Sequence, residues 1–163
     1  MADVAVPTFE SWFLATLPSA KRLARRFDGS GIDTEDAIAE AFARAYVRWQ
    51  QVCLLPYAEA WLLRVLLNLL LDRSRRKSPG PVTDLAPDAT DAVVARLAVT
   101  SALGQLSRRQ RQAVSLRYLA DLSEADVSHA LGVSRNTVKR HVSRGVEALR
   151  QTIGANWEAA LED

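Results

Sequence analysis

The 163-residue chain has one cysteine, two histidines and no long uninterrupted apolar run. The single thiol, Cys53, excludes an internal disulfide framework and a zinc site built from several cysteines. The most apolar stretch, Ala60 to Leu71, contains Arg64 and Asn68 and falls short of the ~20 residues that cross a bilayer, so we expect no membrane span. No basic region leads into an apolar segment near the N-terminus, so we expect no secretory signal and a cytoplasmic protein.

Sequence signals of catalysis are lacking as well. The chain has no phosphate-binding glycine loop, no nucleophile elbow and no histidines at metal-ligand spacing, since His129 and His141 are its only two. An active site needs convergent titratable groups, so we expect no enzyme, no metal and no cofactor. Hydrophobic residues make up 48% and charged residues 25% of the chain, a balance typical of a folded globular protein.

Charge is unevenly distributed along the chain. The formal net charge is +2 for residues 1–77, −3 for 78–91, +6 for 92–150 and −3 for 151–163. A basic segment next to an acidic one is typical of a module that binds a polyanion, because neutralised phosphates release their counterions. Nucleic acid is therefore the predicted partner.

Residues 78–91 divide the chain into two predicted domains. This segment holds three of the six prolines, one glycine and no basic residue, which predicts a flexible linker. Helical periodicity on both sides gives domains over 1–77 and 92–154, followed by an acidic tail over 155–163. No alternating run of β-branched residues indicates a strand, so the expected fold is all-α.

The first domain is predicted to be a bundle of three helical segments. The first segment contains one or two helices interrupted near Pro18. The second has an acidic start and an apolar stripe made by Ile38, Phe42, Ala45 and Trp49. The third begins soon after Pro56, turns Trp61, Val65 and Leu69 inward, and ends in the basic cluster Arg73, Arg75, Arg76 and Lys77.

The second domain is predicted to contain a helix-turn-helix. Ser107 and Ser123 each begin a capping-box pattern, with Gln110 and Asp126 at the third position, and Ser134 is a third candidate cap. Two helical turns over 124–131, a short turn containing Gly132, and a helix to about Arg150 follow in order. The inner stripe is predicted to comprise Val127, Leu131, Val133, Val138, Val142, Val146 and Leu149.

The opposite side of the second helix carries long cationic and short polar side chains, which fits a helix that enters the major groove. Arginine can bond a guanine edge and asparagine an adenine edge, so these residue types suit base reading. The candidates for base contact are Arg135, Asn136, Thr137, Lys139, Arg140, Ser143 and Arg144. The candidates for phosphate contact, from the preceding helix, are Arg108, Arg109, Arg111 and Arg117.

These motifs resemble the extracytoplasmic-function (ECF) group of bacterial sigma factors. The stretch over residues 102–150 resembles region 4 of that family, which implies recognition of the minus-thirty-five promoter element. The stretches DTEDAIAEAFARAYVRW and AWLLRVLLNLLLDRSRRK resemble region 2, which implies binding to core RNA polymerase and opening of the minus-ten element. The resemblance implies contacts to the polymerase β′ clamp and β flap, promoter DNA as a ligand, and an anti-sigma factor as regulator.

The resemblance also assigns roles to residues of the first domain. Asp36 and Glu40, with Arg44, fall on the polymerase-binding helix, where the four-residue spacing of the two carboxylates places them on one face. Asn68 and Asp72 fall on the promoter-melting helix, and the set for the minus-ten element is Asn68, Arg73, Arg75, Arg76 and Lys77. Residues Gln50 to Tyr57 correspond to the loop that captures a flipped base, and here that loop is unusually apolar.

The sequence leaves two alternative functions open. A helix-turn-helix regulator could bind DNA without serving as a polymerase subunit, although its usual receiver domain would need a parallel sheet. A sigma-like interaction module could bind polymerase or an anti-sigma protein without starting transcription. Ala39 keeps the second reading open, because the family commonly has glutamine there.

Overall fold

The computed structural model describes residues 6–28, 30–77, 91–155 and 157. These residues form helices without any strand, as the sequence predicts. The helices of the first half are α1 (Phe9–Arg25), α2 (Thr34–Val47), α3 (Trp49–Val52) and α4 (Ala58–Lys77). Those of the second half are α5 (Asp91–Gln105), α6 (Arg108–Tyr118), α7 (Glu124–Leu131) and α8 (Arg135–Ile153). Within the described ranges, no helix is long and apolar enough to span a membrane.

Helix α1 is continuous, so the predicted interruption near Pro18 is wrong. Proline lacks the N–H that would bond the carbonyl four residues earlier, yet Pro18 sits inside the helix. Burial of Ala20, Leu23 and Ala24 against the neighbouring helices stabilises the helix beyond the proline. Packing of an apolar face therefore outweighs the lost backbone hydrogen bond.

The three predicted serine caps of the second half are confirmed. Ser107, Ser123 and Ser134 each accept a hydrogen bond from the backbone N–H three residues later, at 3.3, 3.0 and 3.1 Å. Each bond satisfies one of the amides left free at a helix start. In the Ser123 box the hydroxyl also donates to the Asp126 carboxylate, at 2.8 Å.

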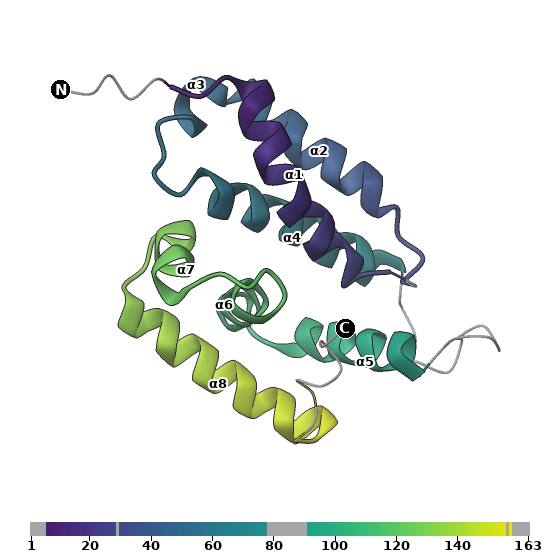
Figure 1. Ribbon diagram of the computed structural model, residues 1–163. Coiled ribbons are helices and arrows are strands. Elements are labelled where there is room, and N and C mark those ends of the chain that lie inside the picture. Colours follow the sequence, from purple (N-terminus) through teal and green to yellow (C-terminus); the bar gives the residue numbers. More distant parts are fainter. Residues whose placement is uncertain (1–5, 29, 78–90, 156, 158–163) are drawn as a thin grey trace.

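Helix α4 lies at the centre of the molecule, between the helices of the first half and those of the second (Figure 1). It contacts α1 and α2 on one side and α5, α6 and α7 on the other. Leu62, Leu66, Leu67 and Leu70 are fully buried, whereas the predicted inward residues Trp61, Val65 and Leu69 are only half-buried. A helix that is apolar on most of its circumference is covered on more than one side, which is what α4 shows.

Residues 78–90 lie outside the described residues, and so does most of the predicted tail. Helix α5 begins at Asp91, the last residue of the predicted linker. Within the predicted tail, Trp157 is buried and its ring meets that of Tyr118 edge-on, with centroids 4.9 Å apart. The second half therefore uses at least one side chain beyond α8 in its core.

Candidate nucleic-acid interface

A tight turn fixes α7 and α8 relative to each other. Gly132 ends α7 in the left-handed conformation, with φ of 65°, where a side chain would be strained. The N–H of Val133 donates to the Ser128 carbonyl at 3.1 Å, and the Ser128 hydroxyl donates to the Val133 carbonyl at 2.6 Å. Val138, Val146 and Leu149 of α8 are buried, as predicted, so the remaining face of α8 is turned to solvent.

The predicted base-contacting residues share this solvent-facing side of α8. All are exposed except Thr137, which is half-buried and bonded through its hydroxyl to Ser134 at 2.9 Å. Lys139 lies 3.8 Å from the Glu124 carboxylate of α7. The exposed residues without a polar partner among the described residues are Arg135, Asn136, Arg140, Ser143 and Arg144. A ligand can therefore bind these side chains without breaking a hydrogen bond or ion pair within the described chain.

The four arginines of α6 differ in their surroundings. Arg108 and Arg109 are exposed at the start of the helix. Arg111 is half-buried and bonds the Leu106 carbonyl at 3.5 Å, while Arg117 is half-buried and bonds the Leu122 carbonyl. Arg117 therefore also ties α6 to the turn before α7, which the sequence pattern did not indicate.

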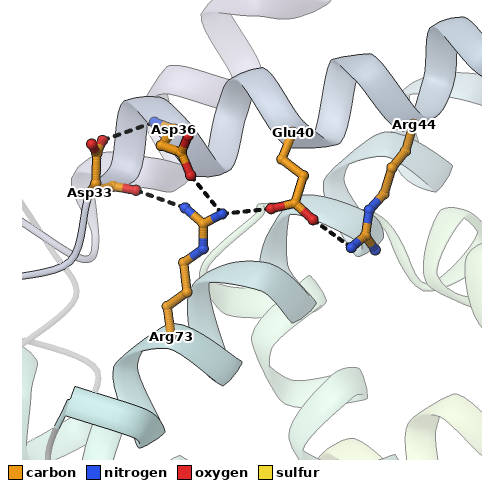
Figure 2. A network of polar contacts seen from close by, with 5 residues as sticks. All are labelled: Asp33, Asp36, Glu40, Arg44 and Arg73. Carbon is orange, nitrogen blue, oxygen red and sulfur yellow. Dashed lines mark hydrogen bonds and ion pairs between the residues drawn. The ribbon is translucent and has the colours of Figure 1, made fainter.

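Three predicted polymerase-binding residues and one predicted DNA-binding residue form a single network between α2 and α4 (Figure 2). Nη2 of Arg73 lies 2.8 Å from Asp36 and 2.6 Å from Glu40, and its Nη1 donates to the Asp33 carbonyl at 3.1 Å. The other carboxylate oxygen of Glu40 lies 2.5 Å from Arg44. Arg73 is thus engaged within the first half, facing the acidic side of α2.

Glu40 is the titratable centre of this network. Partial burial alone would raise the pKa of its carboxyl, but the hydrogen bonds and charges of Arg44 and Arg73 outweigh that effect. The net result is a pKa lowered from its ordinary value of 4.5. Glu40 is therefore ionised at neutral pH.

The other residues predicted to bind the minus-ten element lie along the C-terminal part of α4. Arg75 pairs with Asp72 at 2.9 Å, Lys77 donates to the Gly31 carbonyl, and Arg76 is exposed without a polar partner among the described residues. Asn68 is half-buried at the side of α4 that faces α6. Of these candidates for the minus-ten element, Arg76 alone is both exposed and without a polar partner in the part of the chain that the structure describes.

An apolar groove runs between α2 and α4 beside the acidic network. It has a volume of about 470 Å³ and is lined by Glu40, Ala43, Arg44, Val47, Arg48, Trp61 and Val65. Val47 is 84% exposed, and the neighbouring Tyr46 is 65% exposed. The apolar wall of the groove, formed by Val47, Trp61 and Val65, is thus bordered by the charged side chains Glu40, Arg44 and Arg48.

Sequence reasoning missed a contact between the two halves. The rings of Tyr57 and His129 are stacked, with centroids 5.1 Å apart and planes at 11°. A cavity of about 330 Å³ lies between α4 and α6, and its lining residues are Asn68, Leu71, Asp72, Arg75, Arg108, Arg111 and Gln112. The nearly all-round apolar pattern of α4 was the signal that could have predicted a second partner for this helix.

The described residues contain no group of three or more histidine, cysteine or carboxylate side chains placed to hold a metal ion.

Comparison with known proteins agrees with both halves of this architecture. Residues 12–79 match the family described as Sigma-70 region 2, and residues 96–149 match Sigma-70, region 4. The chain is 31% identical to an RNA polymerase sigma-E factor of Streptomyces coelicolor, over 90% of this chain and 86% of that protein. It is 30% identical to the ECF RNA polymerase sigma factor SigL of Mycobacterium tuberculosis, over 81% of each.

A solved structure shares the fold. The sigma factor RpoE of Bartonella quintana, in complex with the anti-sigma factor NepR, superposes with a TM-score of 0.58 at 21% identity, over 91% of this chain and 98% of that one. The fold and the matched segments define a two-module sigma-70 protein. The chain belongs to the ECF sigma factors of that class.

Proposed function

We propose that the chain joins core RNA polymerase, directs it to promoters with minus-ten and minus-thirty-five elements, and promotes promoter melting. The observation that carries this proposal is the solvent-facing side of α8, where five polar and cationic side chains lack partners in the described chain. The helix-turn-helix holds that face clear of the core, in the position a recognition helix needs. The match over region 2 as well as region 4 favours an initiation factor over a stand-alone regulator.

In this proposal the second module reads the upstream element. Arg135, Asn136 and Arg140 bond base edges, helped by Thr137, Lys139, Ser143 and Arg144. Arg108 and Arg109 anchor phosphates, because both are exposed at the start of α6. Arg111 and Arg117, which are half-buried, have a smaller share of the phosphate contact.

The first module binds polymerase and the melted strand. The acidic side of α2, with Asp36, Glu40 and Arg44, and the adjoining groove meet the β′ clamp, while the second module meets the β flap. Asn68, Arg75, Arg76 and Lys77 engage the minus-ten strand, with Arg73 holding α4 against α2. Binding energy to flipped bases offsets the few kcal/mol needed to unstack them, so no covalent chemistry is required.

The relatives supply two further parts of the proposal. A sigma factor of the same fold is held by the anti-sigma factor NepR, and we propose an anti-sigma partner for this chain too. Because its targets are polymerase and the promoter, the chain acts in the cytoplasm.

The direct test is an equilibrium titration of labelled chain with purified core RNA polymerase. We expect tight binding by the wild type and weaker binding by Asp36→Asn combined with Glu40→Gln, which keeps the size of both side chains but removes their charge. Glu35→Gln is the matched control, because Glu35 is exposed on the same helix and outside the network. Failure of the wild type to bind core would overturn the function, whereas equal affinity of the charge-neutral variant would overturn only the assignment of this face.

A further inference from the structure

The cavity of about 330 Å³ between α4 and α6 has a polar lining. Its lining side chains come from one face of each helix, because they follow one another at spacings of three and four residues. The polar and charged ones are Asn68, Asp72, Arg75, Arg108, Arg111 and Gln112. Leu71 is the one apolar residue among those that line the cavity. Such a lining suits a polar occupant, since cavities formed by imperfect packing of a core are lined by apolar groups.

Positive charge exceeds negative charge around this cavity. Three of its lining residues are arginines, and Asp72 is the one carboxylate among them. Asp72 is paired with Arg75 at 2.9 Å, whereas Arg108 has no hydrogen bond or ion pair among the described residues. Arg111 reaches only the Leu106 carbonyl, at 3.5 Å, and its Nε is buried without a hydrogen-bond partner in that part of the chain. Two guanidinium groups at the cavity therefore have donors available for an anion.

Neighbouring arginines strengthen the positive field. Burial lowers the pKa of Arg64, and the charges of Arg109 and Arg108 lower it further. Burial also lowers the pKa of Arg111, with a contribution from Arg75 that the paired carboxylate partly offsets. Guanidinium groups remain cationic at neutral pH, so these side chains repel one another across the contact between the two helices. A bound anion relieves that repulsion.

Gln112 adds a buried acceptor to this cationic lining. The residue is 7% exposed, and its Oε1 has no hydrogen-bond partner among the described residues. A buried acceptor without a donor is unfavourable. The oxygens of an ionised phosphate ester are acceptors and cannot satisfy Oε1, whereas a hydroxyl group on the same molecule can donate to it. The lining therefore fits a molecule that carries both a phosphate and a hydroxyl group.

The size and chemistry of the cavity narrow the class of ligand. Its volume is at the lower end of the range of about 300–1,000 Å³ that is typical of small-molecule sites. None of the described residues that line it is aromatic, so no side chain there stacks on a nucleobase. A phosphate monoester carries close to two negative charges at neutral pH and accepts several charge-assisted hydrogen bonds from arginine. The diester phosphates of DNA carry one charge each, so they match the two guanidinium groups less well.

We propose that the cavity between α4 and α6 binds a small sugar phosphate, with its phosphate on Arg108 and Arg111 and one of its hydroxyl groups donating to Gln112. The ligand contacts both helices and therefore stabilises the folded chain by mass action. This inference goes beyond the proposed function, because the binding involves neither polymerase nor a promoter.

The test is a titration of the isotope-labelled 163-residue chain, free of polymerase and DNA, with ribose 5-phosphate, followed by nuclear magnetic resonance. We expect saturable shifts that include the side-chain amide of Gln112. Ribose alone and inorganic phosphate should each bind about tenfold or more weakly, because each lacks one of the two kinds of contact. Adenosine monophosphate contains the same sugar phosphate and should bind no more tightly, since no described lining residue stacks on its base.

Two adjacent arginines provide a matched pair of substitutions. Arg108 and Arg109 are both exposed on α6, but only Arg108 lines the cavity. Arg108→Gln should weaken binding of ribose 5-phosphate about tenfold or more, as expected for the loss of a hydrogen bond between charged groups. Arg109→Gln removes the same charge one residue away and should weaken binding less than about threefold at physiological salt, where exposed charges are screened.

Gln112→Met separates the hydroxyl contact from the phosphate contact. Methionine has a similar length and lacks the amide oxygen, so ribose 5-phosphate should bind more weakly while the affinity for inorganic phosphate stays the same. Equal weakening of both ligands would overturn the role of the hydroxyl. Because Gln112 is buried, circular dichroism checks that this variant folds. If it does not fold, the comparison of Arg108→Gln with Arg109→Gln still decides whether the cavity is the site.

Several results would overturn the sugar phosphate site. Equal weakening by Arg108→Gln and Arg109→Gln would show that the ligand is attracted only by the general positive charge of α6. Equal affinity for inorganic phosphate, or tighter binding of adenosine monophosphate, would contradict the proposed ligand class. Absence of ribose 5-phosphate binding at millimolar concentration, with binding of a short DNA duplex that Arg108→Gln weakens, would assign these arginines to DNA instead. None of these results bears on affinity for core polymerase, which is measured separately.

Discussion

Arg73 of α4 and Glu40 of α2 form an ion pair with an Nη2 to Oε2 distance of 2.6 Å, and Asp36 shares the same guanidinium nitrogen. The side chain of Arg73 is 23% exposed, so this pair is the best shielded of the network. It joins the acidic side of α2 to the C-terminal part of α4. One guanidinium therefore connects the side of α2 that we propose binds polymerase to the part of α4 that we propose binds DNA.

Replacement of Arg73 should destabilise the first module. Arg73→Ala removes three polar contacts and leaves two carboxylates facing each other, so we expect the free energy of unfolding to fall by about 1–2 kcal/mol, allowing for partial exposure. Urea denaturation followed by circular dichroism measures this change. Arg76→Ala is the control, because an exposed side chain without a partner should change stability by less than about 0.5 kcal/mol. Equal effects of the two substitutions would show that the network does not stabilise the fold.

The Glu40 network should also make stability depend on pH. The pKa of Glu40 is lowered in the folded chain, so its contribution is present above its unfolded value of 4.5 and is lost as pH falls through the folded value. We expect the wild type to be more stable than Glu40→Gln at pH 7, and the difference to shrink below about pH 4. Denaturation of both proteins from pH 7 to pH 3 measures it. A difference that stays constant over this range would exclude Glu40 as the titrating group.

Gly145 permits the close approach of α8 to α6. A Cβ at this position would lie 2.5 Å from Cγ2 of the buried, β-branched Val114, so Gly145→Ala should destabilise the second module by about 1–2 kcal/mol despite the better helix propensity of alanine. Gly104→Ala is the matched control, because no atom lies within 4 Å of the new methyl, and it should stabilise by up to about 1 kcal/mol. Thermal unfolding of both variants checks the contrast, and a destabilised Gly104→Ala chain would contradict it.

Substitutions on the exposed face of α8 should change promoter choice. Arg135→Ala or Arg140→Ala in the holoenzyme should lower promoter affinity about 5- to 150-fold and relax base preference in the upstream element, since a good base contact is worth about 1–3 kcal/mol. Arg150→Ala is the control at the exposed end of the same helix. Binding to a library of promoter variants measures the base preference, and an unchanged preference would remove α8 as the recognition helix.

Arg76→Ala, in contrast, should chiefly impair promoter opening.

Local patterns in the sequence predicted most of the local structure. The serine caps, the glycine turn and the inner stripe of the helix-turn-helix depend on residues within a few positions of one another. The caps and the turn are confirmed, and so is the stripe, except that Val133 and Val142 are only half-buried. Ile38, Phe42 and Ala45 of α2 are buried as predicted, whereas Trp49, the fourth residue of that predicted stripe, begins α3 and is half-buried. The predicted break near Pro18 is wrong because the effect of this proline on α1 is decided by packing against other helices and not by its neighbours in the sequence.

Contacts between distant residues were beyond local patterns. The sequence predicts that the basic cluster after Asp72 binds DNA as a unit, yet Arg73 pairs with a carboxylate 33 positions away, while Arg76 remains exposed. The stack of Tyr57 on His129 joins residues that share no motif. Periodicity gives the face on which a residue lies, but not which other helix covers that face.

Run-off transcription with purified core RNA polymerase and a library of genomic promoters is the most direct measurement. We expect core enzyme alone to give no promoter-specific transcripts and addition of the chain to give discrete ones whose templates share two elements at fixed spacing. If the chain binds core and DNA yet adds no specific transcript, while another initiation subunit does so in the same reaction, the proposed role in starting transcription is wrong.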